Sequence, residues 1–180
     1  PSDRKILFDS VLIRNIYPLK YSCCLALLMN FYLRLRIGEL ASLSFSDFDL
    51  TNKCVRITKN LVKYYPRDEE GRRSATMQYI ISDDLKTKTA KRVLPLTDEC
   101  IYLYEKLLQY HHDMNWKSEF ICYDGTDVIM SRSLDRTLRR LCQLCGIQHI
   151  NSHRIRKSYA SVLHMSGIPT RVISDLMGHV

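Results

Sequence analysis

Apolar residues recur at the 3.6-residue period of an α-helix in both the first and the last third of the chain. Ile37, Leu40 and Leu43, for example, share one face of a helix over 36–43. Thr97, Ser131 and Ser152 are expected N-caps, and Pro169 opens the last helix. The predicted helices cover residues 21–33, 36–43, 97–112, 131–146, 152–165 and 169–177.

Between these helices the pattern changes to that of strands. Residues 54–58 alternate apolar and polar positions and are rich in β-branched side chains, which indicates a strand. Further short strands are predicted over 77–82, 92–96 and 119–123. Residues 63–76 are charged and contain a proline and a glycine, which predicts a surface loop. Helices, a few strands and helices again indicate an α+β fold that is mostly helical.

Composition narrows the class of protein. The chain has 180 residues, which is the size of one domain with a substantial core. No apolar run approaches the roughly 18 residues that a membrane span needs, and the first residues lack the apolar segment of a signal peptide. Seven cysteines, an odd number, lie in apolar stretches, so we expect reduced core thiols and not a disulfide framework. These features predict a cytoplasmic protein.

The charge points to a polyanion as partner. Lys and Arg number 27 against 19 Asp and Glu, a formal net charge of +8. A domain this basic is a candidate nucleic-acid binder, because binding phosphates releases condensed counterions. A merely soluble basic protein would have the same composition, so the positions of particular residues must decide.

Three short segments carry the candidate chemistry. The first reads Arg-Ile-Gly-Glu-Leu from Arg36, the second is His-x-x-Arg from His153 to Arg156, and the third is Leu-Met-Gly-His, ending at His179. Each is weak alone. In this order, on predicted helices of a basic domain, they resemble the boxes of the tyrosine recombinase or phage-type integrase family. The resemblance covers essentially the whole chain.

The resemblance implies a catalytic domain with a small antiparallel sheet or β-hairpin. Such a domain breaks DNA without a metal or nucleotide cofactor. A tyrosine attacks a backbone phosphodiester and leaves a 3′-phosphotyrosyl bond and a free 5′-hydroxyl. Carried over by position, Arg36 and Arg156 would clamp the phosphate, since arginine stays charged and forks onto two oxygens. His153 would hydrogen-bond the same phosphate and assist proton transfer, and His179 would donate to a nonbridging oxygen. Glu39 is expected to hold a basic residue in place.

The family takes the proton for the leaving 5′-oxygen from a lysine on a β-hairpin. Residues 85–96 resemble that hairpin, with a Lys-Thr followed by an arginine and by Pro-Leu. This register makes Lys86 the expected general acid. Lys88 also precedes a threonine and is the alternative.

DNA contacts are predicted on two helices and on the strand after the lysine segment. The helix over 131–146 carries arginines opposite a leucine stripe; a solvated face and a face against duplex DNA both fit this pattern, and we favour contact for Arg132 and Arg136. Four further residues are predicted to contact DNA: Lys91, Arg92, Arg154 and Lys157.

Two metal-site interpretations are alternatives to this metal-free recombinase chemistry. Cys142, Cys145, His149 and His153 have a spacing that superficially resembles zinc ligands, but the cysteines also fit the apolar stripe, so core packing is favoured and no metal is expected. A metal-dependent nuclease would need carboxylates, and these lie in turns without a ligand pattern. They are Asp83, Asp84, Asp124 and Asp127.

The chain also departs from the family pattern. The family's nucleophile lies beyond the third box, so we expect residues 1–180 to be a catalytic domain cut before that tyrosine and without the N-terminal DNA-binding domains. Tyr159 is expected to be a packing residue and not the nucleophile. Leu33-Arg34 stand where the family has Thr-Gly, so the local turn is expected to differ, and Arg34 is a competitor for the phosphate.

The leading function is therefore a site-specific integrase of a mobile element that acts on double-stranded DNA. The full-length protein would work as a homo-tetramer on DNA near the nucleoid, without a membrane, and an accessory directionality factor is a further expected partner. The alternative is a catalytically inactive relative that binds DNA as an architectural protein.

Overall fold

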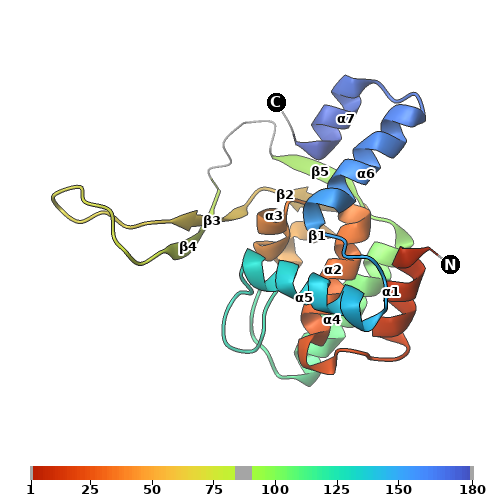
Figure 1. The fold of residues 1–180 in the computed structure, drawn as a ribbon, viewed down its shortest axis with the longest axis horizontal. Helices are drawn as coiled ribbons and strands as arrows, with labels where there is room; N and C mark the ends of the chain where they lie inside the picture. Colours follow the sequence, from red (N-terminus) through yellow and green to blue (C-terminus); the bar gives the residue numbers. More distant parts are fainter. Residues whose placement is uncertain (1, 84–90, 179–180) are drawn as a thin grey trace.

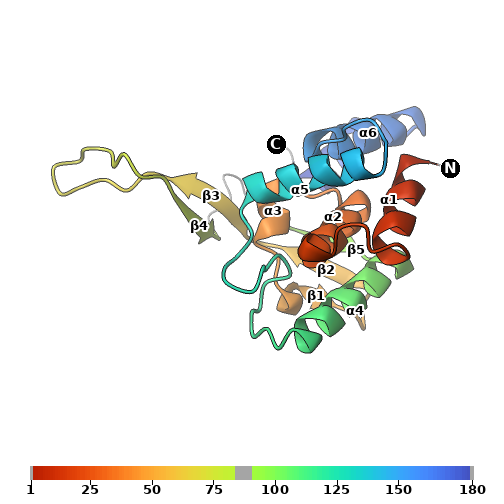
Figure 2. The same cartoon turned by 60° about the horizontal axis from the view of Figure 1, so that its bottom comes forward.

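Helix α2 (Tyr21–Leu33) forms the centre of the molecule in a computed structural model that describes residues 2–83 and 91–178. Every residue from Ser22 to Asn30 is buried. Because α2 has no polar face, other helices must surround it. Three of them pack against it (Figure 1, Figure 2): α1 (Asp3–Leu12), α4 (Asp98–Asp113) and α5 (Ser131–Leu144).

The strands form two small antiparallel sheets. One has the order β1 (Phe48–Asp49), β2 (Cys54–Ile57) and β5 (Arg92–Pro95), and the other pairs β3 (Asn60–Tyr64) with β4 (Gln78–Ser82). The antiparallel pairing confirms the α+β class. In the larger sheet β2 and β5 turn apolar side chains inward, where Val55 pairs with Leu94 and both are buried.

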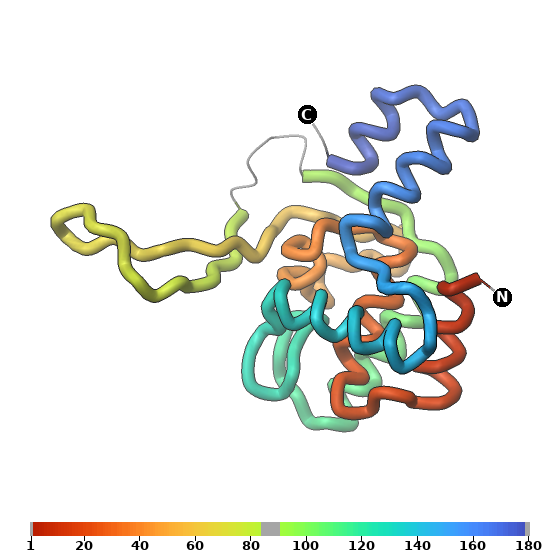
Figure 3. The backbone as a smooth tube through the Cα atoms, in the orientation of Figure 1, coloured from red at the N-terminus to blue at the C-terminus, as the bar shows by residue number. Residues whose placement is uncertain are grey.

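The predicted strands over 77–82 and 92–96 are present as β4 and β5, and they pair with different partners, β4 with β3 and β5 with β2. The prediction of a strand over 119–123 is wrong. Residues 119–123 make only isolated bridges, such as the one between Ser44 and Phe120. The predicted loop over 63–76 is the far part of a β3–β4 arm that extends away from the body (Figure 3).

The remaining elements place the sequence boxes. Helix α3 (Ile37–Ala41) follows α2, and η1 (Pro18–Lys20) and η2 (Phe45–Asp47) are single 3₁₀ turns. Helices α6 (Ser152–Met165) and α7 (Thr170–Met177) form a helical hairpin at one edge of the molecule (Figure 1).

The predicted caps are partly confirmed. Thr97 caps α4, with its side chain accepting a hydrogen bond from the Cys100 amide. The N-cap of α6 is Asn151, one residue before the predicted Ser152, and the N-cap of α5 is Met130, which makes no side-chain cap. Asn151 is in extended backbone and accepts from the amide of the third residue along, which is the favourable geometry for this position.

The seven cysteines lie within the described ranges and are all free thiols. Five are buried, and burial raises the pKa of Cys23 to about 11, so that thiol stays protonated in the core. Among the described residues no helix is both long and apolar enough to cross a lipid bilayer. In the same part of the chain, no three His, Cys, Asp or Glu side chains gather in a way that would hold a metal ion.

Candidate active site

Arg36 lies at the N-cap of α3, directly after the turn that ends α2. The Arg36 amide donates to Glu39 Oε2 at 2.8 Å, the return bond of a capping box, and this bond fixes the start of the helix. Gly38 lets α3 approach β3, because a Cβ at this position would lie 2.7 Å from the Leu61 carbonyl oxygen. The first box is therefore a compact turn pressed against a strand.

Glu39 is the centre of a cluster of arginines. Its side chain is 1% exposed, and its Oε1 accepts from Arg36 Nη1 at 2.8 Å. Arg92, on β5, donates through both terminal nitrogens, at 3.1 Å to Oε1 and 2.9 Å to Oε2. Arg156 Nη1 lies 4.0 Å from Oε2. The expectation that Glu39 holds a basic residue thus agrees with these contacts.

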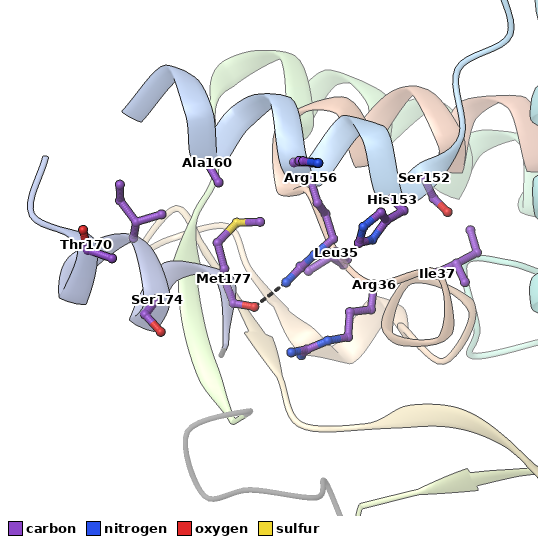
Figure 4. A pocket seen from close by; sticks show the side chains of 12 residues that line it. Leu35, Arg36, Ile37, Ser152, His153, Arg156, Ala160, Thr170, Ser174 and Met177 are labelled. Atoms are coloured by element: carbon purple, nitrogen blue, oxygen red, sulfur yellow. Dashed lines mark hydrogen bonds between the residues drawn. The ribbon is translucent and has the colours of Figure 1, made fainter. Parts of the chain in front are cut away.

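Arg156 and His153 enter the same region from α6. Their side chains extend toward Arg36 (Figure 4), and their spacing of three places them on one helical face. Arg156 Nη1 donates to the Arg34 carbonyl at 2.6 Å, and its Nη2 donates to the Met177 carbonyl. Arg36 Nη2 donates to the next carbonyl along, that of Gly178, at 2.7 Å. The two guanidinium groups therefore meet neighbouring peptide oxygens at the end of α7.

These side chains line one pocket of about 560 Å³ between α3, α6 and α7. Arg36, Arg156 and Lys157 supply its basic groups, His153 adds an imidazole, and three hydroxyl side chains also line it: Ser152, Thr170 and Ser174. The remaining wall is largely apolar, formed by Leu35, Ile37, Ala160, Ile173 and Met177. Segments more than a hundred residues apart in the chain thus place two arginines, a lysine and an imidazole around one cavity, which suits an anionic ligand with an apolar portion.

Burial and charge set the electrostatics. Burial lowers the pKa of Arg156 to about 10, a shift that Glu39 opposes and that Arg36 and Arg92 increase. The group therefore remains a cation at neutral pH. Burial by itself would raise the pKa of Glu39, but hydrogen bonds and charge from Arg92, and then bonds from Arg36, hold it below its usual value. Glu39 is an anion in this cluster.

Arg34 does not face the pocket. It ends α2 in the left-handed region at φ 54°, so the bend that glycine would ease is made here by an arginine. Its guanidinium carbon lies 3.4 Å from the ring centroid of Tyr159, and its Nη1 donates to the Tyr32 carbonyl at 2.7 Å. Tyr159 is half-buried beneath that side chain, outside the main core. The predicted competition of Arg34 for the phosphate finds no support in this arrangement.

Three predicted catalytic residues, Lys86, Lys88 and His179, lie outside the described residues. Among the predicted DNA contacts, Arg132, Arg136, Lys91, Arg154 and Lys157 are exposed, and their roles stay predictions. Arg136 also lines a basic groove of about 380 Å³ with Lys20, Arg139 and Arg140. The leucine stripe opposite these arginines is confirmed, since Leu134, Leu138 and Leu141 are fully buried.

Arg92 departs from the prediction. Its side chain is only 7% exposed and faces Glu39, so it is a buried partner of the cluster and not a surface contact. The strand period could have revealed this. Arg92 and Leu94 are two residues apart and therefore share a face of β5, and the leucine is buried.

The residues considered as metal ligands are explained by packing and by turn hydrogen bonds. Cys142 is fully buried in the core beside the leucine stripe, while His149 is half-buried and His153 is exposed in the pocket. Asp124 accepts hydrogen bonds from Thr126 and from the Asp127 amide, which makes it the organiser of a turn. The cysteine pair is therefore core packing, as favoured from the sequence.

Comparison with known proteins identifies a family. The sequence model described as "Phage integrase family" matches residues 12–180. A tyrosine recombinase XerC-like protein of Caldanaerobacter subterraneus subsp. tengcongensis is 25% identical over 164 residues, which cover 84% of this chain and 41% of that protein. A tyrosine recombinase of Pseudothermotoga lettingae is 26% identical over 156 residues, covering 86% and 44%. The chain thus spans less than half the length of these curated relatives.

Solved structures share the fold. A Tn1549 transposon integrase in complex with circular intermediate DNA superposes with a TM-score of 0.73 at 18% identity, over 99% of this chain and 57% of that one. The XerA recombinase gives a TM-score of 0.67 at 18% identity, over 100% and 54%. At this level of identity the likeness concerns the fold of the domain.

Proposed function

Because the chain belongs to the phage integrase family, we propose that residues 1–180 form the catalytic domain of a site-specific recombinase of a mobile element. The domain would cleave and rejoin double-stranded DNA in the cytoplasm through a 3′-phosphotyrosyl intermediate. One observation carries the proposal: Arg36, His153 and Arg156, from distant parts of the chain, line a single pocket. The Tn1549 integrase complex with DNA supports DNA as the substrate.

The chemistry follows from where negative charge develops. As a tyrosine attacks the phosphodiester, the nonbridging oxygens gain charge, and fixed cations beside them lower the barrier. Arg36 and Arg156 would take these oxygens, and His153 would donate a hydrogen bond and assist proton transfer. Both arginines now donate to carbonyl oxygens of Met177 and Gly178, so a bound phosphate would replace or share those acceptors.

The general acid is assigned to Lys86, with Lys88 as the alternative. The acid protonates the leaving 5′-oxygen, so its loss should be rescued by a leaving group that needs no proton. We expect Lys86→Ala to regain cleavage on a duplex with a 5′-bridging sulfur, and Lys88→Ala to show no such selective rescue, in single-turnover cleavage assays. The reverse pattern would move the assignment to Lys88.

We propose further that, in a protein of the length of the curated relatives, this domain would work with a nucleophilic tyrosine, assemble as a homo-tetramer on DNA and respond to a directionality factor. The test uses this protein and a suicide duplex made from the ends of the element that encodes it. A covalent adduct at a 3′-phosphate through tyrosine is expected. Arg36→Ala and Arg156→Ala should each slow its formation by about 10²–10³-fold, since each removes a transition-state donor.

Arg56→Ala is the matched control, because Arg56 is a half-exposed arginine on β2 that pairs with Asp49 outside the pocket. It should cleave like the unmodified protein. Cleavage that continues unchanged in both Arg36→Ala and Arg156→Ala would refute the assignment. DNA binding without any adduct would favour the inactive architectural relative.

A further inference from the structure

Arg92 joins the first and the third sequence box. It reaches from β5 to both carboxylate oxygens of Glu39, as described above, with a side chain that is 7% exposed. Its guanidinium also lies against the backbone of Gly178, since a Cβ at that glycine would be 2.7 Å from Arg92 Nη1. Arg92 therefore fills the space that a side chain at residue 178 would need, and Gly178 also ends α7 in the left-handed region at φ 62°, which favours glycine.

The charges of the cluster do not cancel. Glu39 contacts Arg36 at 2.8 Å, Arg92 at 2.9 Å and Arg156 at 4.0 Å. Three guanidinium groups and one carboxylate leave a surplus of two positive charges. A phosphoryl group at the pentacoordinate stage carries two negative charges, so the surplus matches the charge that must be stabilised.

Of the three arginines, Arg92 has the most complete bond to Glu39. Its guanidinium donates through both terminal nitrogens to both carboxylate oxygens, whereas the Arg36 guanidinium donates to Glu39 through Nη1, and Arg156 Nη1 lies 4.0 Å from Oε2. A bidentate pair fixes the plane of the carboxylate. Arg92 therefore fixes Glu39 from the β5 side, together with the bonds that the amide and Nη1 of Arg36 make to the same carboxylate.

We propose that Arg92 is a positioning residue that neutralises and orients Glu39, so that Arg36 and Arg156 keep their charge and direction for a doubly charged oxyanion. This inference rests on the proposed function. Folding stability alone does not account for the Arg92–Glu39 pair, because a buried ion pair often contributes no more to stability than apolar side chains of similar volume. Without Arg92, the anionic Glu39 would compete with the ligand for the other two guanidinium groups.

Sulfate is a suitable probe for the test. It is a tetrahedral dianion like the phosphoryl group, and it keeps both charges throughout the neutral and mildly acidic range. The 180-residue chain is titrated with sodium sulfate at constant ionic strength. Binding is followed by the NMR signals of the Arg36 and Arg156 guanidinium groups, so that sulfate bound at other basic surfaces does not count.

Arg92→Met should weaken sulfate binding at neutral pH by about tenfold, since one of the two surplus charges is lost and Glu39 becomes a competitor. The decisive variant is the double substitution Arg92→Met with Glu39→Gln. Removing the carboxylate restores the surplus, so affinity should return to within about threefold of the unmodified chain, a coupling that two independent defects would not show. Arg92→Gln serves in the same cycle if the methionine variant does not fold.

The pH dependence provides a second readout. Without Arg92, burial of Glu39 is less compensated and its pKa rises. Lowering the pH then protonates Glu39 and restores the surplus charge, so the defect of Arg92→Met should shrink as the pH falls. The other titratable side chains that line the pocket, His153 and Lys157, are present in both proteins, so the ratio of the two affinities isolates the effect of Glu39.

Arg56→Met is the control, an arginine of the neighbouring strand with a half-exposed ion pair. It should bind sulfate like the unmodified chain. The inference is overturned if Arg92→Met retains full affinity, or if the double variant is as weak as or weaker than the single one. If Arg36→Ala and Arg156→Ala also leave sulfate binding intact, the proposed function fails as well; if those two lose binding, only the role of Arg92 is wrong.

Discussion

Gly38 has no room for a side chain. A Cβ at this position would lie 2.2 Å from Asn60 Oδ1 and 2.7 Å from the Leu61 carbonyl oxygen, and the second of these is backbone that cannot turn away. We therefore expect Gly38→Ala to lower the free energy of unfolding by about 1–3 kcal/mol, by forcing α3 away from β3. Urea denaturation measures this directly.

The same substitution at Gly71 separates crowding from backbone conformation. Gly71 has φ +78° and no atom within 4 Å of its would-be Cβ, so Gly71→Ala should cost only the left-handed backbone, about 1 kcal/mol. Because Gly38 lies next to Glu39, its crowding should also reduce sulfate binding in the pocket. Equal losses of stability at the two glycines would contradict the packing argument.

At the residue scale, the sequence predicted the site where spacing alone carries the information. Arg36, His153 and Arg156 were chosen by their places in the boxes, and they line one pocket. Arg92 was assigned to the surface because its role depends on a partner 53 residues away. The strand period places Arg92 on the buried face beside Leu94, but its counter-ion can be identified only once the sheet is in place.

Helix α4 carries a buried histidine among aromatic rings. His111 is 3% exposed, and the ring centroids of Phe45 and Trp116 lie 5.1 and 5.0 Å from its own. Burial lowers the pKa of His111, and both ring nitrogens are buried without a hydrogen-bond partner. The folded state therefore holds this imidazole neutral in mildly acidic solution, where an unfolded chain would protonate it.

The sign of the effect follows from linkage. Above the unfolded pKa of about 6.5 both states are neutral at His111, and below it the unfolded state binds the proton first, so stability falls as the pH falls toward the lower folded pKa. We expect His111→Phe to lose less free energy of unfolding than the unmodified chain between about pH 7 and pH 5.5. His112→Gln is the matched control, a histidine at the exposed neighbouring position of the same helix. An unchanged slope in His111→Phe would show that this imidazole is protonated in the folded state.

At the element scale, the sequence predicted long apolar helices well, but it did not predict which strands pair when they are far apart in the chain. Helix α2 lies within the predicted bounds, because thirteen largely apolar residues leave few alternatives. Strands β4 and β5 were also found, but their partners could not be predicted, since alternation identifies a strand and not its neighbour. The N-cap of α6 was missed by one residue because Asn151 and Ser152 are both good caps.

The whole molecule combines a fully packed body with a less buried helical hairpin. Helix α2 is enclosed on all sides, whereas α6 buries only Ser152, Ile155 and Arg156, and α7 only Ile173 and Met177. We expect α6 and α7 amides to exchange hydrogen well before α2 amides, because the hairpin can open without exposing the core. Native-state hydrogen exchange with mass spectrometry measures this. Equal protection in all three helices would mean that the hairpin opens only with global unfolding.

The β3–β4 arm has a consequence for how the gene can change. The interactions toward its tip are local, such as Arg73 over the ring of Tyr65 at 3.7 Å and the bridge between Arg67 and Arg73. Codons can therefore be gained or lost in this segment at little energetic expense, since lengthening a surface loop costs only a logarithmic increase in closure entropy. The arm is the natural place for insertions, whether by evolution or by grafting a label for single-molecule work.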